Sequence, residues 1–586
     1  MRQWMVAAKK ADFYAIAEKF HVDPVVARII RNREVIGEKN IRIYLGGNLL
    51  DLSDPHQMKD MDRLVEILAQ KIRKQVRIRI IGDYDVDGVT SSHLFLTALR
   101  RVGAKVDVVI PHRIQDGYGL SLHLLQQAKE DGVDTILTCD NGIAAIDEIA
   151  WAKAQKMTVL VTDHHAVPFE EHEGRRTEKK SLADAVVNPH QQDCGYPYKE
   201  LCGAGVAWNV IRVLYENYDM DKREAEDLLD FVAMATVCDV MSLTGENRIL
   251  VKEGLKRIRH TKNIGLQALM QACNVQPENI SAYHFGYVLG PCVNATGRLD
   301  TARHALRLFE TGQETEAEEI ARDLVDLNQE RKELTLQGVE MAKKLCEEGG
   351  YENDPVLVLF LPDVHESIAG LIAGRIREMY NRPVFVLTRG EEGVKGSGRS
   401  TENYSMYENM CGCAELFTKF GGHPMAAGLS LPEENVEKFR RKINENCPLT
   451  VEEVCPDIHI DMAMPVGYAS TELVHQFALL EPFGKDNPSP LFADRNLSIS
   501  RMWLIGKNRN VLRMSVLSEY GQPVPVIFFG DVETLFAYFT EKFGQKEVEN
   551  ALHGRKNRIL FSMVYTAKID FYQGNENLQL EMKYYR

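Results

Sequence analysis

The sequence reads Arg77-Ile78-Arg79-Ile80-Ile81-Gly82-Asp83-Tyr84-Asp85-Val86-Asp87-Gly88 at the point where an apolar run meets a cluster of aspartates. The run at residues 77–81 has the β-branched composition of a strand. Ligands in open α/β sheets gather at the carboxyl ends of strands, which is where these aspartates lie. Three carboxylates so close together repel one another, so their charge needs cations, water or hydrogen bonds. Taken alone, an acidic turn that caps a helix at Val89 explains the stretch better than a metal site does.

The region around this stretch alternates between apolar β-rich runs and helix-like segments. That alternation predicts a parallel sheet with crossover helices. We expect strands at residues 77–81, 106–110, 135–139, 157–162 and 185–188. We expect helices at residues 91–101, 121–130, 143–155, 205–217 and 224–236.

The rest of the chain divides into further predicted parts. Residues 1–45 are expected to be an N-terminal extension, and residues 46–313 the first α/β domain. Residues 314–350 are rich in Glu, Lys, Leu and Ala, which favours a long connecting helix over a flexible linker. Strands and helices alternate again in a smaller α/β domain at residues 351–450, and short strands at residues 451–586 predict a small barrel or sandwich.

Composition limits the class of protein. A chain of 586 residues exceeds what one hydrophobic core usually holds, so several domains are expected. We expect a soluble intracellular protein, because no apolar run approaches the roughly 20 residues of a membrane helix and the N-terminus shows no secretory pattern. The 11 scattered cysteines are expected to be reduced thiols. A net charge of -14 argues against a generally basic DNA-binding surface, although local basic grooves remain compatible with it.

Acidic and histidine residues recur after three more predicted elements. Asp140 follows the strand at 135–139, Asp163-His164-His165 follows the strand at 157–162, and Asp239 follows an apolar helix. Carboxylate and imidazole ligands in this mixture suit Mn²⁺ or Mg²⁺, and a shared Asp would bridge two ions about 3.5–4 Å apart. A lone His-His pair is more often structural than catalytic. The recurrence at four positions nevertheless favours a metal site that hydrolyses phosphoesters.

These motifs, in their order and spacing, resemble the core motifs of the DHH phosphoesterase superfamily: Gly82-Asp83-Tyr84-Asp85-Val86-Asp87-Gly88, Asp140-Asn141-Gly142, Asp163-His164-His165 and Cys238-Asp239-Val240. Four other stretches are similar to its RecJ exonuclease branch: residues 111–119, 294–298, 421–428 and 481–488. The resemblance covers about residues 45–586. It implies a multidomain α/β fold with a parallel-sheet DHH core, a long connecting helix, a DHHA1 substrate domain and a C-terminal OB-like β-barrel.

The resemblance also implies roles for individual residues. One divalent cation would be held by Asp83, Asp85 and Asp140. A second would be held by Asp87, Asp140, His164 and Asp239, with Asp140 as the bridge. His165 would lie beside the scissile phosphate, and Arg298 would stabilise the charge that develops there.

A pocket for a 5′ phosphate is implied at Ser397 and Arg399, together with Arg113. Glycines beside Ser397 would let backbone amides approach an anion, although an ordinary Gly-rich turn would look the same. Tyr118 would stack on a base or pack in the core, and His423 would contact the substrate or be a buried structural histidine.

The last domain carries interleaved basic and aromatic side chains, at Arg501, Trp503, Lys507, Arg509 and Arg513. Such a face suits the tracking of a single strand by an OB fold. The alternative is a solvated surface with Trp503 in the core.

The resemblance implies a bacterial, cytoplasmic, monomeric exonuclease that hydrolyses single-stranded DNA from 5′ to 3′ with two Mn²⁺ or Mg²⁺ ions. It would release mononucleotides in DNA repair and recombination, with a helicase and a single-strand-binding protein as further partners. One alternative is a DHH phosphodiesterase for short oligonucleotides or cyclic dinucleotides. Another is a non-catalytic single-strand-binding scaffold, although such decay should remove metal ligands and none is missing.

Overall fold

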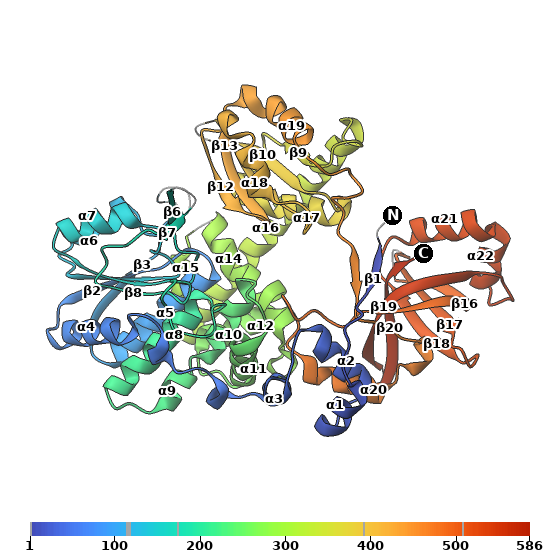
Figure 1. Ribbon diagram of the computed structural model, residues 1–586, viewed down its shortest axis with the longest axis horizontal. Coiled ribbons are helices and arrows are strands. Elements are labelled where there is room, and N and C mark those ends of the chain that lie inside the picture. Colours follow the sequence, from blue (N-terminus) through green and yellow to red (C-terminus); the bar gives the residue numbers. More distant parts are fainter. Residues whose placement is uncertain are drawn as a thin grey trace. The chain divides into compact units, whose positions relative to one another are not determined.

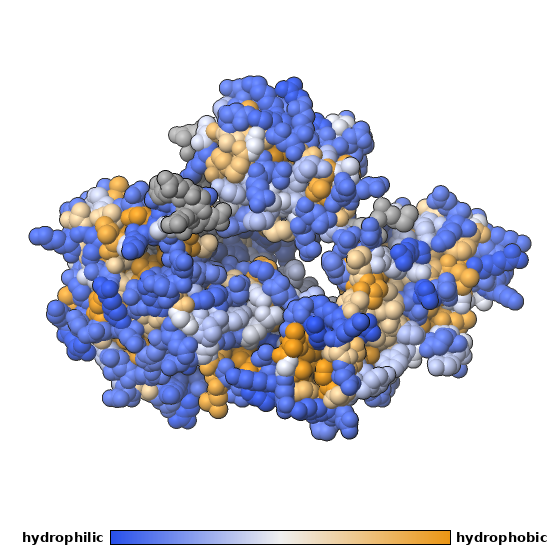
Figure 2. Space-filling view, in the orientation of Figure 1, coloured by the Kyte–Doolittle hydropathy of each residue, from blue (hydrophilic) through white to orange (hydrophobic). Residues whose placement is uncertain are grey.

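The computed structural model describes residues 3–112, 116, 119–172, 175–299, 301–390, 393–506, 509–572 and 574–586. They form two compact units. Figure 1 labels the helices and strands of both. The larger unit holds Leu52–Ser242 and Glu246–Pro456, and the smaller holds Gln3–Asp51, Leu243–Gly245 and Asp457–Arg586. Among the described residues, no helix is both long and apolar enough to cross a bilayer. The face in Figure 2 is mostly hydrophilic, with apolar residues in scattered patches.

A five-stranded parallel sheet lies at the centre of the first domain. Its strands, in spatial order, are β3 (Lys105–Val109), β2 (Arg77–Ile81), β4 (Thr135–Cys139), β5 (Thr158–Thr162) and β8 (Ala185–Val187). The predicted parallel sheet is therefore confirmed. A charged antiparallel hairpin, β6 (Phe169–His172) with β7 (Arg175–Glu178), lacks the apolar alternation of a strand and was not predicted.

Helices cover both faces of this sheet. On one face lie α6 (Leu122–Glu130) and α7 (Ile146–Ala154), and on the other α4 (Met61–Arg73), α5 (Val86–Arg101) and α8 (Gly203–Asn217) (Figure 1). The predicted start of α5, at residue 89 or 91, was too late. The helix begins at Val86 because the Asp85 side chain caps it, accepting the Gly88 N–H at 3.1 Å.

The segment 224–236, predicted as one helix, is broken into α9 (Lys222–Glu226) and α10 (Leu229–Cys238). The break carries neither Gly nor Pro, so the residue pattern does not reveal it. The domain continues through α11 (Gly245–Ile258), α12 (Ile264–Ala272), α13 (Ala282–His284), the π-helical turn η4 (Phe285–Leu289), α14 (Gly290–Leu299) and α15 (Arg303–Glu310). The long helix α16 (Glu314–Glu348) follows and confirms the predicted connecting helix.

The second α/β domain has a mixed five-stranded sheet. The order is β12 (Lys419–His423), β13 (Ala426–Leu431), β11 (Gly393–Arg399), β10 (Val384–Gly390) and β9 (Leu357–Phe360). Only β9 and β10 are parallel. Its helices are α17 (Ala369–Tyr380), α18 (Met406–Cys411) and α19 (Val436–Glu445).

The smaller unit is built on a closed sheet. Its strands are β15 (Met462–Ala463), β16 (Phe492–Ile505), β17 (Val511–Leu517), β18 (Pro523–Phe528), β20 (Asn575–Tyr585) and β19 (Leu560–Tyr572), and the pairing of β16 with β19 closes it. Helices α20 (Thr471–Phe477), α21 (Val532–Phe543) and α22 (Gln545–Leu552) belong to the same unit.

The N-terminal segment packs into this smaller unit. It contributes β1 (Trp4–Val6), α1 (Phe13–Phe20), α2 (Pro24–Asn32) and α3 (Glu38–Gly46). Strand β1 pairs in parallel with β14 (Ile458–Ile460), and the apolar side chains of α1 and α2 share a core with the closed sheet. The Arg33 guanidinium forms a bidentate ion pair with Asp461, at 2.8 and 3.2 Å. Chain segments more than 400 residues apart thus form one folded unit.

We expect Asp461→Ala to destabilise the smaller unit by about 3–5 kcal/mol, because it leaves the nearly buried Arg33 charge without its carboxylate. Calorimetric unfolding of the full chain measures the effect. Glu34→Ala serves as the control, since its ion pairs with Lys9 and Arg31 are exposed and should contribute little. Equal melting profiles for the two variants would contradict this role of the Arg33–Asp461 pair.

Candidate metal centre

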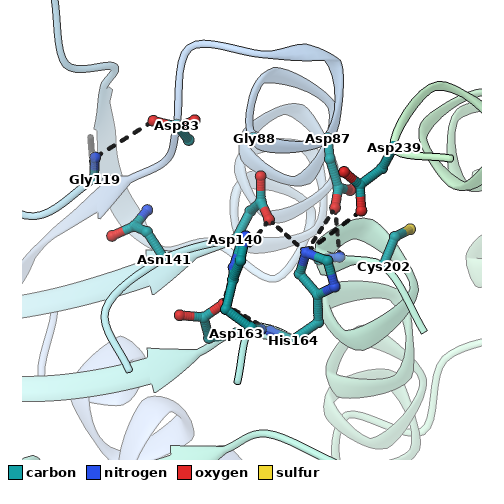
Figure 3. Close-up of polar contacts among 12 residues, drawn as sticks. Asp83, Asp87, Gly88, Gly119, Asp140, Asn141, Asp163, His164, Cys202 and Asp239 are labelled. Carbon is teal, nitrogen blue, oxygen red and sulfur yellow. Dashed lines mark hydrogen bonds and ion pairs between the residues drawn. The ribbon is translucent and has the colours of Figure 1, made fainter. Parts of the chain in front are cut away.

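The acidic and histidine side chains converge at the carboxyl edge of the parallel sheet (Figure 3). Asp83, Asp140 and His164 follow the central strands β2, β4 and β5. Asp87 lies in the first turn of α5, and Asp239 is the C-terminal cap of α10. Two helices and three strands therefore deliver ligands to one place.

The loop after β4 has a backbone conformation that requires the sequence Asp140-Asn141-Gly142. Asp140 has a φ of +61° and Gly142 a φ of +108°, and Asp and Gly are the residues that tolerate this region. A Cβ on Gly142 would lie 2.7 Å from Thr138 Oγ1. Between them, the Asn141 amide donates to the Ile81 and Cys139 carbonyls at 3.0 and 2.8 Å. This bonding fixes Asp140 beside the end of β2.

Three groups of side chains each bring their ligand atoms within 4.8 Å of one another. The first comprises Asp83, Asp85 and Asp140, and the second comprises Asp87, His164 and Asp239. The third, Asp140, His164 and His165, shares a residue with each of the other two. His164 Nε2 lies 3.1 Å from Asp140 Oδ1 and 3.6 Å from a carboxylate oxygen of both Asp87 and Asp239 (Figure 3). Asp140 therefore stands between the first two groups.

The electrostatics of the cluster call for positive charge. Burial and the charge of Asp85 raise the pKa of Asp83 well above its usual range. Burial, followed by the charges of Asp87, Asp85, Asp239 and Asp83, does the same to Asp140. Hard oxygen donors joined by one imidazole are the ligand set of Mn²⁺ or Mg²⁺, so the residues present fit two such ions.

Backbone donors hold Asp87 in place. Its two carboxylate oxygens accept the N–H groups of Gly203 and Ala204, at 2.6 and 2.7 Å, at the N-terminus of α8. A Cβ on Gly203 would lie 2.6 Å from Asp140 Cβ, so only glycine lets α8 approach this closely. Sequence reasoning missed Gly203, because no motif marks it.

Asp163 was also missed as a site residue, although it lies in a recognised motif. Its Oδ1 accepts the backbone N–H groups of His164 and His165 and contacts His165 Nδ1 at 2.8 Å. Burial lowers the pKa of His165, but the hydrogen bond and charge of Asp163 outweigh it and raise that pKa to about 9. Asp163 thus orients His165 and favours its protonated form.

The glycine-rich stretch of the second α/β domain shares a hollow with the acidic stretch. The hollow measures about 470 Å³, and its lining includes Tyr84, Ser367 and Ser397. A Cβ on Gly370 would lie 2.9 Å from Arg399 Nη2 and 3.1 Å from Ser397 Oγ, so these two side chains are neighbours. Arg298 Nη1 donates to the carbonyl of Ser367, one of the residues that line the hollow, at 2.6 Å.

The other predicted contact residues are less informative. His423 is exposed at the end of β12, so it is not a buried structural histidine. Its register partner Ala426 is paired in turn with Arg399. Arg113 and Tyr118 lie outside the described residues.

In the smaller unit, Trp503 is half-buried on β16 rather than part of the buried core. The guanidinium groups of Arg501 and Arg513 each lie 5.8 Å from the centre of its ring. Arg509 is exposed, and Lys507 falls outside the described residues.

Known proteins resemble this chain in every part. Residues 77–236 match the DHH family, N-terminal domain, residues 353–447 the DHHA1 domain, and residues 460–584 the RecJ OB domain. The single-stranded-DNA-specific exonuclease RecJ of Haemophilus influenzae is 32% identical over 582 residues, covering 96% of each chain. The chain belongs to the RecJ family.

Other RecJ proteins support this assignment. The Bacillus subtilis RecJ is 33% identical over 87% of this chain, and the match spans 63% of that protein. The structure of Thermus thermophilus RecJ in complex with Mn²⁺ is 25% identical, covers all of this chain and 79% of its own, and superposes with a TM-score of 0.81. The structure of the same protein in complex with Mg²⁺ is 24% identical in sequence and superposes with a TM-score of 0.74, which supports the fold. The DHH, DHHA1 and OB domains therefore follow in the predicted order.

We expect Gly203→Ala to weaken Mn²⁺ binding at least about tenfold, because the added Cβ displaces Asp140 or the amides that hold Asp87. Isothermal titration of the metal-free protein measures this affinity. Gly205→Ala is the matched control, since its Cβ would meet the Leu201 side chain at 3.4 Å. Equal Mn²⁺ affinities of the two variants would refute the importance of this contact.

We expect Asp163→Asn to lower the pKa of His165 in the metal-free protein. Without the Asp163 charge, burial dominates and disfavours the imidazolium, so His165 loses its proton below the wild-type value of about 9. NMR titration of isotopically labelled histidines measures the shift, with the remaining histidines as internal references. An unchanged titration of His165 would show that Asp163 does not hold its proton.

Proposed function

We propose that this chain is a metal-dependent exonuclease that hydrolyses single-stranded DNA from the 5′ end and releases mononucleotides. The observation that carries the proposal is the shared hollow. Tyr84 of the acidic stretch and Ser397 of the glycine-rich stretch line the same cavity, which supports a phosphate-binding site and a metal centre that would serve one substrate.

We assign the metal ligands to two cation sites. Asp83, Asp85 and Asp140 would hold one cation, and Asp87, Asp140, His164 and Asp239 the other. Mn²⁺ or Mg²⁺ at these ligands would activate water and neutralise charge during phosphoester hydrolysis. Mn²⁺ and Mg²⁺ are the ions bound in the Thermus RecJ structures.

The chain's own groups supply the rest of the chemistry. His165, held by Asp163, offers a proton to a phosphate oxygen beside the cluster. Arg298, which donates to the carbonyl of Ser367 in the lining of the hollow, adds a fixed positive charge. Both groups would favour the transition state, in which charge on the phosphoryl oxygens increases.

The polarity follows from the anion site. Ser397 and Arg399 lie side by side and would bind a terminal 5′ phosphate, joined by Arg113. A terminal phosphate carries charge that an internal phosphodiester lacks, so this site selects the end of a strand. His423 and Tyr118 would contact the adjoining nucleotides.

We further propose a setting that the relatives' names favour. The relatives from Bacillus subtilis and Haemophilus influenzae are RecJ exonucleases named as specific for single-stranded DNA. The chain would act in the bacterial cytoplasm as a monomer, in DNA repair and recombination. A helicase and a single-strand-binding protein would supply and present the strand. The Trp503 face of the closed sheet would bind that strand through stacking and phosphate contacts.

End-labelled single strands of both polarities, incubated with Mn²⁺, test the proposal. We expect stepwise loss of 5′ nucleotides, slow attack on blunt duplexes, and at least about 10³-fold less activity in Asp140→Asn. Asp230→Asn is the control, because Asp230 is a buried aspartate of α10 outside the cluster. Action on dinucleotides alone would favour a short-oligonucleotide phosphodiesterase, and binding without cleavage a scaffold.

A further inference from the structure

An accessible stripe runs along the helical segment at residues 282–299, which joins α13, η4 and α14. Tyr283 and Tyr287 are exposed on it, and Pro291, Asn294 and Arg298 are half-buried. The other residues from 289 to 297 are buried, whereas His284, Gly286 and Val288 beside the tyrosines are half-buried. Their spacing of three or four residues places them on one side of the helix. The stripe therefore connects two exposed tyrosines with Arg298.

The two tyrosines form an exposed aromatic surface. Tyr283 is 62% exposed and Tyr287 is 70% exposed. Their ring centres lie 5.0 Å apart with an angle of 24° between the planes, so the rings are stacked on each other. The segment that carries them is packed against the protein, because the intervening Phe285 is fully buried. Two large rings held side by side in solvent are suited to stacking with another planar group.

The surface is attached to the helix that carries a metal ligand. Cys238 Sγ donates to the Phe285 carbonyl at 3.3 Å, and Asp239 is the next residue in the chain. A Cβ on Gly290 would lie 2.3 Å from Cys238 Sγ, so the π-helical turn packs directly against the end of α10. A π-helical turn inside an α-helix is often found at functional sites.

The stripe also reaches the catalytic groups at its other end. Asn294 Oδ1 accepts the Val86 N–H at 3.2 Å, at the start of the helix that holds Asp87. From Tyr287 to Arg298 the helix rises about 16 Å. A stacked strand at ~3.4 Å per nucleotide would cross this length in at most about five nucleotides.

We propose that Tyr283 and Tyr287 form a base-stacking step for single-stranded nucleic acid, a few nucleotides from the scissile phosphate. This inference rests on the proposed function. Nucleobases are the favoured occupant because the stripe is continuous with the metal centre, through Asn294 and Arg298. Stacking on aromatic rings tolerates any base, as an exonuclease requires. The two tyrosines would bind the strand on the side of the scissile phosphate that faces away from the 5′ phosphate site.

The double variant Tyr283→Ala/Tyr287→Ala tests the proposal. We expect its KM for a 5′-phosphorylated 20-nucleotide strand to rise at least about fivefold, with kcat changed less than about twofold. The double Phe variant keeps the rings and should restore the wild-type KM. Hydrolysis of a 5′-phosphorylated dinucleotide should be unaffected, since it is too short to reach the step. Tyr14→Ala, an exposed tyrosine of the smaller unit, serves as the control.

A second readout needs no catalysis. Strands with a single 2-aminopurine at successive positions are bound in the presence of EDTA, and stacking on a ring quenches their fluorescence. We expect quenching within about five nucleotides of the 5′ end, and its loss in the double Ala variant but not in the double Phe variant.

The outcomes separate the two proposals. If the wild type cleaves no single strands, the proposed function fails, whereas quenching still reports on the stacking step. If the wild type cleaves normally but neither KM nor quenching changes in the double Ala variant, the stacking step is wrong. A rise in KM that the Phe variant does not reverse would also overturn it, because the rings would not be the cause.

Discussion

Mutual repulsion among buried carboxylates is the constraint on which the structure depends. Asp83, Asp87 and Asp140 are almost completely buried at one sheet edge. Burial and neighbouring charges raise the pKa of Asp83 and of Asp140 well above the usual range. Such a cluster persists only if the surrounding structure determines its position. The sheet register, the cap of α5 and the amides of α8 all act to that end. Binding of two cations would then relieve the repulsion that the fold has enforced.

The same constraint explains the close packing around the cluster. Gly88 meets the Asp83 backbone, Gly203 meets Asp140, and Gly297 meets the Tyr84 carbonyl at distances that exclude a Cβ. Each contact brings a different helix against the loops that carry the carboxylates. Because the ligands come from separate helices and strands, a displacement of any one helix would alter the site. Tyr283 and Tyr287 lie on the helical segment that continues into α14, so a strand bound at these tyrosines would contact an element that also packs against the metal-binding loops.

Much of the fold could be predicted from the sequence, because many strands and helices are determined by the residues within a single segment. Buried parallel strands appear as continuous β-branched runs, and α16 appears as a long segment of helix formers. The helix α5 begins earlier than expected because Asp85 caps it through the Gly88 N–H, a contact that places Val86 and Asp87 in the first turn. Gly203 acts through a backbone contact that leaves no spacing in the sequence, whereas Asp163 lies in a recognised motif but acts through its neighbour His165. The pairing of β1 with β14 joins residues more than 450 positions apart, which no local pattern encodes.

Two cations are expected to occupy this cluster, with Asp140 between them. Anomalous diffraction from crystals grown with Mn²⁺ would locate them. We expect two peaks, one bound by Asp83, Asp85 and Asp140, and one bound by Asp87, Asp140, His164 and Asp239. A single peak that Asp140 does not contact, or no peak at these side chains, would contradict this expectation.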